Sequence, residues 1–114
     1  MDPADRNTLN ETMNRMWTRF LPELLGRLDA LEVAAAALSA GALSAEQRQR
    51  AVAAAHNLAG VLGTFGLAEG SVLARKAEEL CTRADGTDHE STRLEVIAAE
   101  LSSLISNRKE IGSA

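Results

Sequence analysis

The sequence has few of the residues that build β-sheets. Its 114 residues include one Trp, two Phe and no Tyr, and only 15 Val, Ile and Thr together. Alanine, by contrast, occurs 21 times. Alanine has the highest helix propensity, whereas β-branched and aromatic residues favour strands. The composition therefore predicts an all-α domain and argues against an all-β sandwich or barrel.

Basic runs, paired cysteines and long apolar segments are also missing. The chain has 12 Lys and Arg against 16 Asp and Glu, a net charge of −4, which argues against electrostatic binding of nucleic acid. Cys81 has no second thiol for an internal disulfide, so a reducing compartment is favoured. No apolar run reaches membrane-spanning length, and the acidic N-terminus is unlike a secretory signal. We expect a cytoplasmic, monomeric protein without nucleic-acid or membrane partners.

Helix start signals divide the chain. Capping-box patterns, in which Ser or Thr precedes Glu or Gln by three residues, begin at Thr8, Ser44 and Thr87. Pro22 suits the first turn of a helix, and Gly41 and Gly66 are positioned to end helices. These signals predict a short first helix from about 8 to 19, a second from the proline to Gly41, a third over 45–65, a fourth over 68–83 and a last one after the box at Thr87.

Apolar residues recur at spacings of three and four, which predicts one buried stripe for each long helix. The inward candidates of the second helix are Leu21, Leu24, Leu25, Leu28, Leu31, Ala35 and Leu38. Those of the fourth helix are Val72, Leu73, Ala77, Leu80 and Cys81. Those of the last helix are Leu94, Ile97, Leu101, Leu104 and Ile105. Because the linkers are short, we predict an antiparallel up-down four-helix bundle with a short N-terminal capping helix. Trp17 and Phe20 are expected to pack that first helix onto the bundle. Residues 1–114 form one domain with an ordered core of about 8–106, and residues 107–114 are expected to fray.

His56 stands out in the third predicted helix. On a helical wheel it lies about 160° from Leu58, whereas Ala51, Ala54, Leu62 and Phe65 lie within about 40° of that leucine. The residues around the histidine are mostly small: Gln49, Val52, Ala53, Ala59, Gly60 and Gly63. Glycine inside a helix costs roughly 1 kcal/mol relative to alanine. The bare surface therefore favours access to the imidazole by a bulky partner, although an exposed histidine is usually only solvated and the glycines could instead allow close helix packing.

The segment His56-Asn57-Leu58-Ala59-Gly60, followed by Gly63 and Phe65-Gly66-Leu67, resembles the signature of histidine-containing phosphotransfer (HPt) domains. The resemblance implies a four-helix bundle in which His56 accepts a phosphoryl group from a receiver aspartyl phosphate and passes it to another receiver. The implied partners are response-regulator receiver domains and a hybrid histidine kinase. No cofactor is expected to be bound stably, and Mg²⁺ would come from the receiver. The chain is too short for an additional ATP-binding domain, so a phosphocarrier is expected rather than a kinase.

Two positions depart from the family signature. Ala59 stands where a lysine is usual, and Val61 where a serine is usual. Arg75 or Lys76 of the next helix, or less favourably Arg48, would then neutralise the phosphoryl charge. The alternative function is a non-phosphorylated helical docking module that binds a receiver or kinase domain.

No metal site is expected from the remaining residues. The sequence has no HExxH or CxxC motif and no paired histidines at metal-ligand spacing. His89 is expected to be solvated at a helix start, and Cys81 to be buried and inert.

Overall fold

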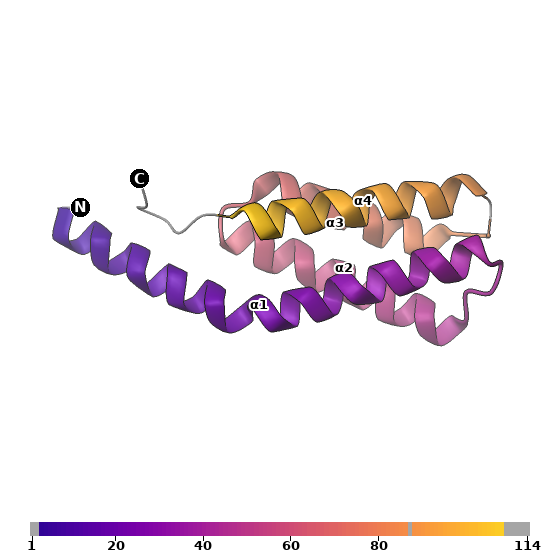
Figure 1. Cartoon of the computed structure of the whole chain (residues 1–114), viewed down its shortest axis with the longest axis horizontal. Coiled ribbons are helices and arrows are strands. Elements are labelled where there is room, and N and C mark those ends of the chain that lie inside the picture. The colour runs from indigo at the N-terminus through magenta and orange to yellow at the C-terminus, as the bar shows by residue number, and fades with distance from the viewer. Residues whose placement is uncertain (1–2, 87, 109–114) are drawn as a thin grey trace.

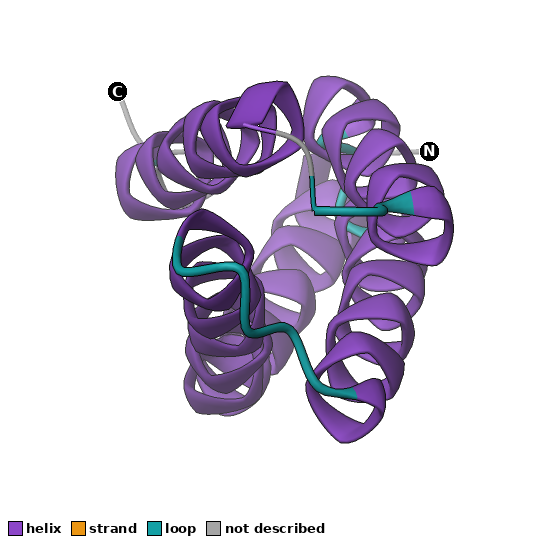
Figure 2. Ribbon diagram, turned by 90° about the vertical axis from the view of Figure 1, so that its right-hand side faces the viewer, coloured by secondary structure: helices purple, strands orange, loops and turns teal. Residues whose placement is uncertain are grey.

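The protein is a bundle of four helices. The computed structural model describes residues 3–86 and 88–108, and within them all regular secondary structure is helical. The helices are α1 (Pro3–Ser39), α2 (Ala45–Thr64), α3 (Ala68–Arg83) and α4 (Asp88–Asn107) (Figure 1). Helices that follow one another in sequence pack together, α1 also packs against α4, and the four surround a common interior (Figure 2). The predicted all-helical bundle is thus confirmed.

The prediction of a separate N-terminal capping helix is wrong. Residues 8–19 and the predicted second helix are one continuous α1, with Pro22 inside it. Proline cannot donate to the Thr18 carbonyl and its ring crowds that group, which bends a helix without necessarily ending it. Figure 1 shows such a bend about midway along α1. Trp17 and Leu24, on either side of the proline, are both buried in the same core, and this packing holds the two halves together.

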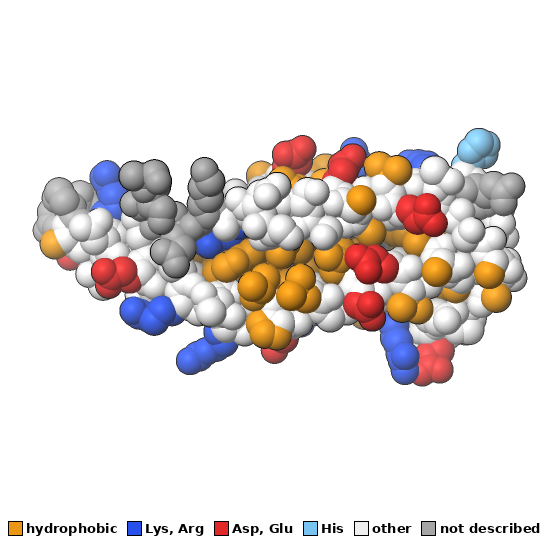
Figure 3. Space-filling view, viewed as in Figure 1, with side chains coloured by type: hydrophobic (Ala, Val, Ile, Leu, Met, Phe, Trp, Pro, Cys, Tyr) orange, Lys and Arg blue, Asp and Glu red, His pale blue; other side chains and the backbone are white. Residues whose placement is uncertain are grey.

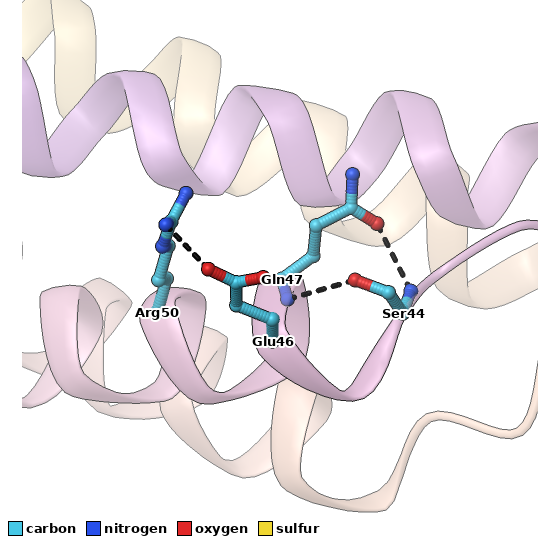
Figure 4. A network of polar contacts seen from close by, with 4 residues as sticks. All are labelled: Ser44, Glu46, Gln47 and Arg50. Carbon is cyan, nitrogen blue, oxygen red and sulfur yellow. Dashed lines mark hydrogen bonds and ion pairs between the residues drawn. The ribbon is translucent and has the colours of Figure 1, made fainter.

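The three predicted capping boxes have different outcomes. Thr8 lies inside α1, where its hydroxyl donates to the Ala4 carbonyl at 3.1 Å, so the first box is wrong. Ser44 is confirmed as the N-cap of α2: its Oγ accepts the Gln47 N–H at 3.0 Å, and Gln47 Oε1 accepts the Ser44 N–H at 2.9 Å (Figure 4). The box at Thr87 lies outside the described residues.

Glycine ends α2 as predicted. Gly66 has a φ of +77°, a left-handed conformation that glycine adopts without steric cost. The chain then reverses, and the Leu67 N–H donates to the Leu62 carbonyl at 2.8 Å. α3 follows over the predicted range, which places α2 and α3 side by side. Of the predicted C-terminal frayed segment, Asn107 belongs to α4, and residues 109–114 lie outside the described part of the chain.

The core consists of leucine and alanine side chains from all four helices. Its largest fully buried members are Leu24, Leu31, Leu58, Leu62, Leu94, Leu101 and Cys81. The predicted inward orientation is wrong for two residues, because Leu25 is 49% exposed and Val72 is 47% exposed. Each is the chain neighbour of a buried leucine, and one helical step of about 100° turns its side chain outward.

An aromatic cluster closes the end of the bundle where α2 finishes. Trp17 meets Phe65 edge to face at 5.2 Å between ring centroids, and Phe20 meets Phe65 at 6.4 Å. The Arg108 guanidinium lies over the Trp17 ring at 4.6 Å, a cation–π arrangement. The prediction that Trp17 and Phe20 pack α1 onto the bundle is confirmed. None of the described helices combines the length and apolar character needed to cross a bilayer.

Candidate functional site

His56 projects from the outer side of α2. Its side chain is 74% exposed, whereas Leu58 and Ala55 on the same helix are completely buried. This is the orientation that the helical wheel predicts. The imidazole is therefore accessible to a second macromolecule, while the opposite side of the helix anchors it to the core.

Glu78 of α3 holds the imidazole from one side. Its Oε2 lies 3.1 Å from His56 Nδ1, and its side chain is 30% exposed. An ionised carboxylate only accepts hydrogen bonds, so Nδ1 must carry the proton. In the neutral ring this leaves the Nε2 lone pair available. The contact thus favours the tautomer in which Nδ1 carries the proton and Nε2 has a free lone pair.

The sequence reasoning missed Glu78. A signal for it was present, because His56 and Glu78 are nearly symmetric about the turn at Gly66. Two helices that pack side by side across such a turn bring symmetric positions to the same level. Finding the contact nevertheless required knowing which side of α3 faces α2.

An open groove of about 460 Å³ begins at His56 and runs between α2 and α3. Three of the residues that were expected to surround the histidine line it, with Gln49 and Ala53 exposed and Val52 half-buried. The whole lining is Arg48, Gln49, Val52, Ala53, His56, Asn57, Glu78 and Thr82. The groove is therefore a concave, mainly α2-derived surface whose lining includes His56 and Glu78.

The other side of His56 is bare. Gly60 is exposed, and a Cβ added there would have nothing within 4 Å. Gly63 is also exposed, but a Cβ there would lie 3.5 Å from Ser71 Oγ, an ordinary contact with α3. Gly60 therefore leaves open space beside the imidazole, and the Gly63 position lies against the neighbouring helix.

Ala59 does not belong to the accessible face. It is only 6% exposed, and its carbonyl accepts a hydrogen bond from Ser71 Oγ at 2.8 Å. The expectation that Ala59 lines the face around His56 is wrong. α2 packs against both α1 and α3, so the buried arc of its surface is wider than the single stripe assumed from the wheel.

The three candidate cations occupy different places. Arg48 donates through Nη1 to the Cys81 carbonyl and through Nη2 to the Ala84 carbonyl, each at 2.7 Å, so its guanidinium binds the C-terminal end of α3. Lys76 lines a groove between α3 and α4 and is about 160° from Glu78 round α3. Arg75 is exposed and about 60° from Glu78. Of the three, Arg75 is the exposed cation on the same side of α3 as Glu78.

The remaining candidates do not build a second centre. Among residues 3–86 and 88–108, no group of three or more His, Cys, Asp and Glu could hold a metal ion. Burial raises the pKa of the Cys81 thiol to about 11, although the nearby Arg48 charge lowers it in part. His89 is exposed on α4.

A model of the Hpt domain matches residues 15–107, a range that includes His56, Glu78 and the whole groove. The chain belongs to the Hpt domain family. Comparisons with curated proteins and with solved structures found no match. Hpt domains are phosphocarrier modules of phosphorelays rather than kinases.

Proposed function

We propose that His56 accepts a phosphoryl group from an aspartyl phosphate on a receiver domain and passes it to a second receiver. The observation that carries this proposal is the exposed imidazole whose Nδ1 lies 3.1 Å from the Glu78 carboxylate. The contact through Nδ1 leaves Nε2 on the opposite side of the ring from the Glu78 carboxylate. The carboxylate also places a negative charge next to the ring.

The transfer is a substitution at phosphorus. The Nε2 lone pair forms the N–P bond while the bond between phosphorus and the aspartyl oxygen breaks, and the aspartate leaves as a carboxylate. The ring keeps its Nδ1 proton, so it becomes positively charged as the N–P bond forms. The Glu78 carboxylate stabilises that charge through the hydrogen bond. Delivery to the second receiver is the same step in reverse.

The surface around His56 suits a receiver active site. Gly60 offers no side chain that would block approach to the imidazole, and the groove on the other side provides a concave contact surface. Phosphoryl transfer depends mainly on positioning and on neutralisation of the phosphoryl oxygens. We expect Mg²⁺ on the receiver to supply most of that neutralisation, with Arg75 as the exposed cation that this chain adds on the Glu78 side of α3.

A docking module without phosphorylation is the second candidate. The observation that favours it is Ala59, which occupies the usual lysine position of the family signature and is buried. A docking module would bind receivers through the same groove, but His56 would be dispensable for binding.

Phosphotransfer from a panel of phosphorylated receiver domains separates the two candidates. Label would be read on a phosphate-affinity gel, with acid lability as the sign of phosphohistidine. We expect label on the wild type and on His89→Gln, which removes an exposed histidine elsewhere, and none on His56→Gln. Label that persists in His56→Gln contradicts the proposal. Binding without label from any receiver would support the docking module.

The role of Glu78 has its own test. Glu78→Gln retains an acceptor for the Nδ1 proton but removes the charge, and a charge-assisted hydrogen bond is about twice as strong as a neutral one. A loss of about 1.4 kcal/mol in transition-state stabilisation corresponds to a transfer rate about tenfold slower. Glu79→Gln is the matched control, because Glu79 pairs with the exposed Arg83 at 2.7 Å. Equal transfer rates for the two variants would contradict the role of Glu78.

A further inference from the structure

The N-terminal part of α1 extends beyond the rest of the bundle. α1 has 37 residues, whereas α2 and α4 have 20 each, and Figure 1 shows the excess projecting past the end at which α2 finishes. The Hpt match begins only at residue 15. In Figure 1 no other described helix runs beside these projecting turns.

A short apolar stripe lies on this segment. Leu9, Met13, Met16 and Phe20 follow one another at spacings of four, three and four, the pattern of a coiled-coil seam. Leu9 is 48% exposed and Met16 38% exposed, while Met13 and Phe20 are half-buried against the core. Figure 3 shows charged side chains of both signs on the projecting part of α1. In the described part of the chain, Leu9 and Met16 are thus the members of this seam that remain exposed.

The stripe is complementary to itself in one orientation. If a second copy lies antiparallel about the midpoint of residues 14 and 15, Leu9 faces Phe20 of the other copy and Met13 faces Met16. The same seam then places Arg6 opposite Glu23, and both of these residues are exposed. In a parallel pair, Arg6 would face Arg6. Charge complementarity therefore selects the antiparallel arrangement.

We propose that the protein forms an antiparallel homodimer through residues 6–23 of α1. Stable interfaces bury about 1,600 Å² in total, and a seam of three side-chain layers repeated by symmetry is smaller, so the dimer is weak and concentration-dependent. The groove beside His56 is lined by α2 and α3 without a residue of α1, so the dimer would carry two such grooves. The monomer expected from the sequence would then be the dilute form.

Sedimentation equilibrium from micromolar concentration up to about 1 mM tests the proposal. We expect the wild type to dimerise and Leu9→Asp to raise the dissociation constant at least about tenfold, since each dimer buries two copies of this side chain. Asn7→Asp is the matched control, because Asn7 is exposed and lies about 160° from Leu9 round the helix. A wild type that stays monomeric throughout, or equal weakening by both variants, overturns the proposal.

Two further variants test the register. Arg6→Glu should weaken the dimer, and combining it with Glu23→Arg should restore it, because the ion pair is then reversed. Glu23 also pairs with Arg27 of its own helix at 3.6 Å, so Glu23→Arg alone serves as the reference for that loss. Cysteine exchange gives the orientation: Met13→Cys and Met16→Cys chains should cross-link faster when mixed than either does alone. Faster cross-linking of Met13→Cys with itself, or no rescue by charge reversal, overturns the antiparallel register.

Discussion

Replacement of Arg48 by alanine should destabilise the bundle. The guanidinium crosses from α2 to the end of α3 and donates to two carbonyls, those of Cys81 and Ala84, each at 2.7 Å. Hydrogen bonds to charged groups are worth about 1.5–3 kcal/mol each. Because the site is only partly buried, water replaces part of this interaction. We therefore expect Arg48→Ala to lower the free energy of unfolding by about 2–4 kcal/mol.

Urea unfolding followed by circular dichroism measures this loss. Arg50→Ala is the control, since Arg50 lies on the same helix, is exposed and pairs only locally with Glu46 at 2.6 Å (Figure 4). Exposed pairs of this kind contribute about 0.3–0.5 kcal/mol. Arg48→Lys should fall between the two, because an ammonium retains the charge near the helix C-terminus but not the planar fork. A free energy of unfolding for Arg48→Ala equal to that of Arg50→Ala would refute the reasoning.

The same variant separates a structural role from a role in phosphate neutralisation. With both outer nitrogens of Arg48 bound to α3 carbonyls, we expect Arg48→Ala to accept a phosphoryl group on His56 within about twofold of the wild-type rate while it is folded, a change of less than about 0.5 kcal/mol. A large loss of transfer rate with unchanged stability would instead assign Arg48 to the phosphoryl site.

Three other outcomes are expected. Gly60→Ala should raise the free energy of unfolding by up to about 1 kcal/mol, because nothing lies within 4 Å of the added Cβ and alanine favours the helix. The same variant should slow phosphotransfer from a receiver if the bare surface serves docking. Denaturation and transfer assays on one preparation measure both effects. Pro22→Ala should stabilise the protein by about 1–3 kcal/mol by restoring a donor to the Thr18 carbonyl, and unchanged stability would mean that the bend itself is needed for packing. Cys81 should resist a thiol reagent at pH 8 until the chain unfolds, because burial raises its pKa to about 11. Rapid labelling of the folded protein would contradict this. The free energy of unfolding should also fall at higher pH, because the thiol of the unfolded chain ionises before that of the folded protein.

Local signals in the sequence were sufficient for most helix boundaries. The Ser44 box and the glycine at position 66 act within one turn of backbone, and α2 and α3 begin and end within a residue of the predicted positions. Pro22 carried an equally clear local signal, but α1 continues through it. The reason is tertiary: residues on both sides of the proline are buried in one core, and that burial outweighs the lost hydrogen bond.

The candidate site divides in the same way. The outward position of His56 and the open surface at Gly60 follow from the helical period, which is a property of the sequence. The burial of Ala59, the Glu78 contact with the imidazole and the attachment of Arg48 to α3 depend on which side of α3 faces α2. That orientation is decided by packing between helices, because each helix has several apolar positions and only the assembled core selects which of them are buried.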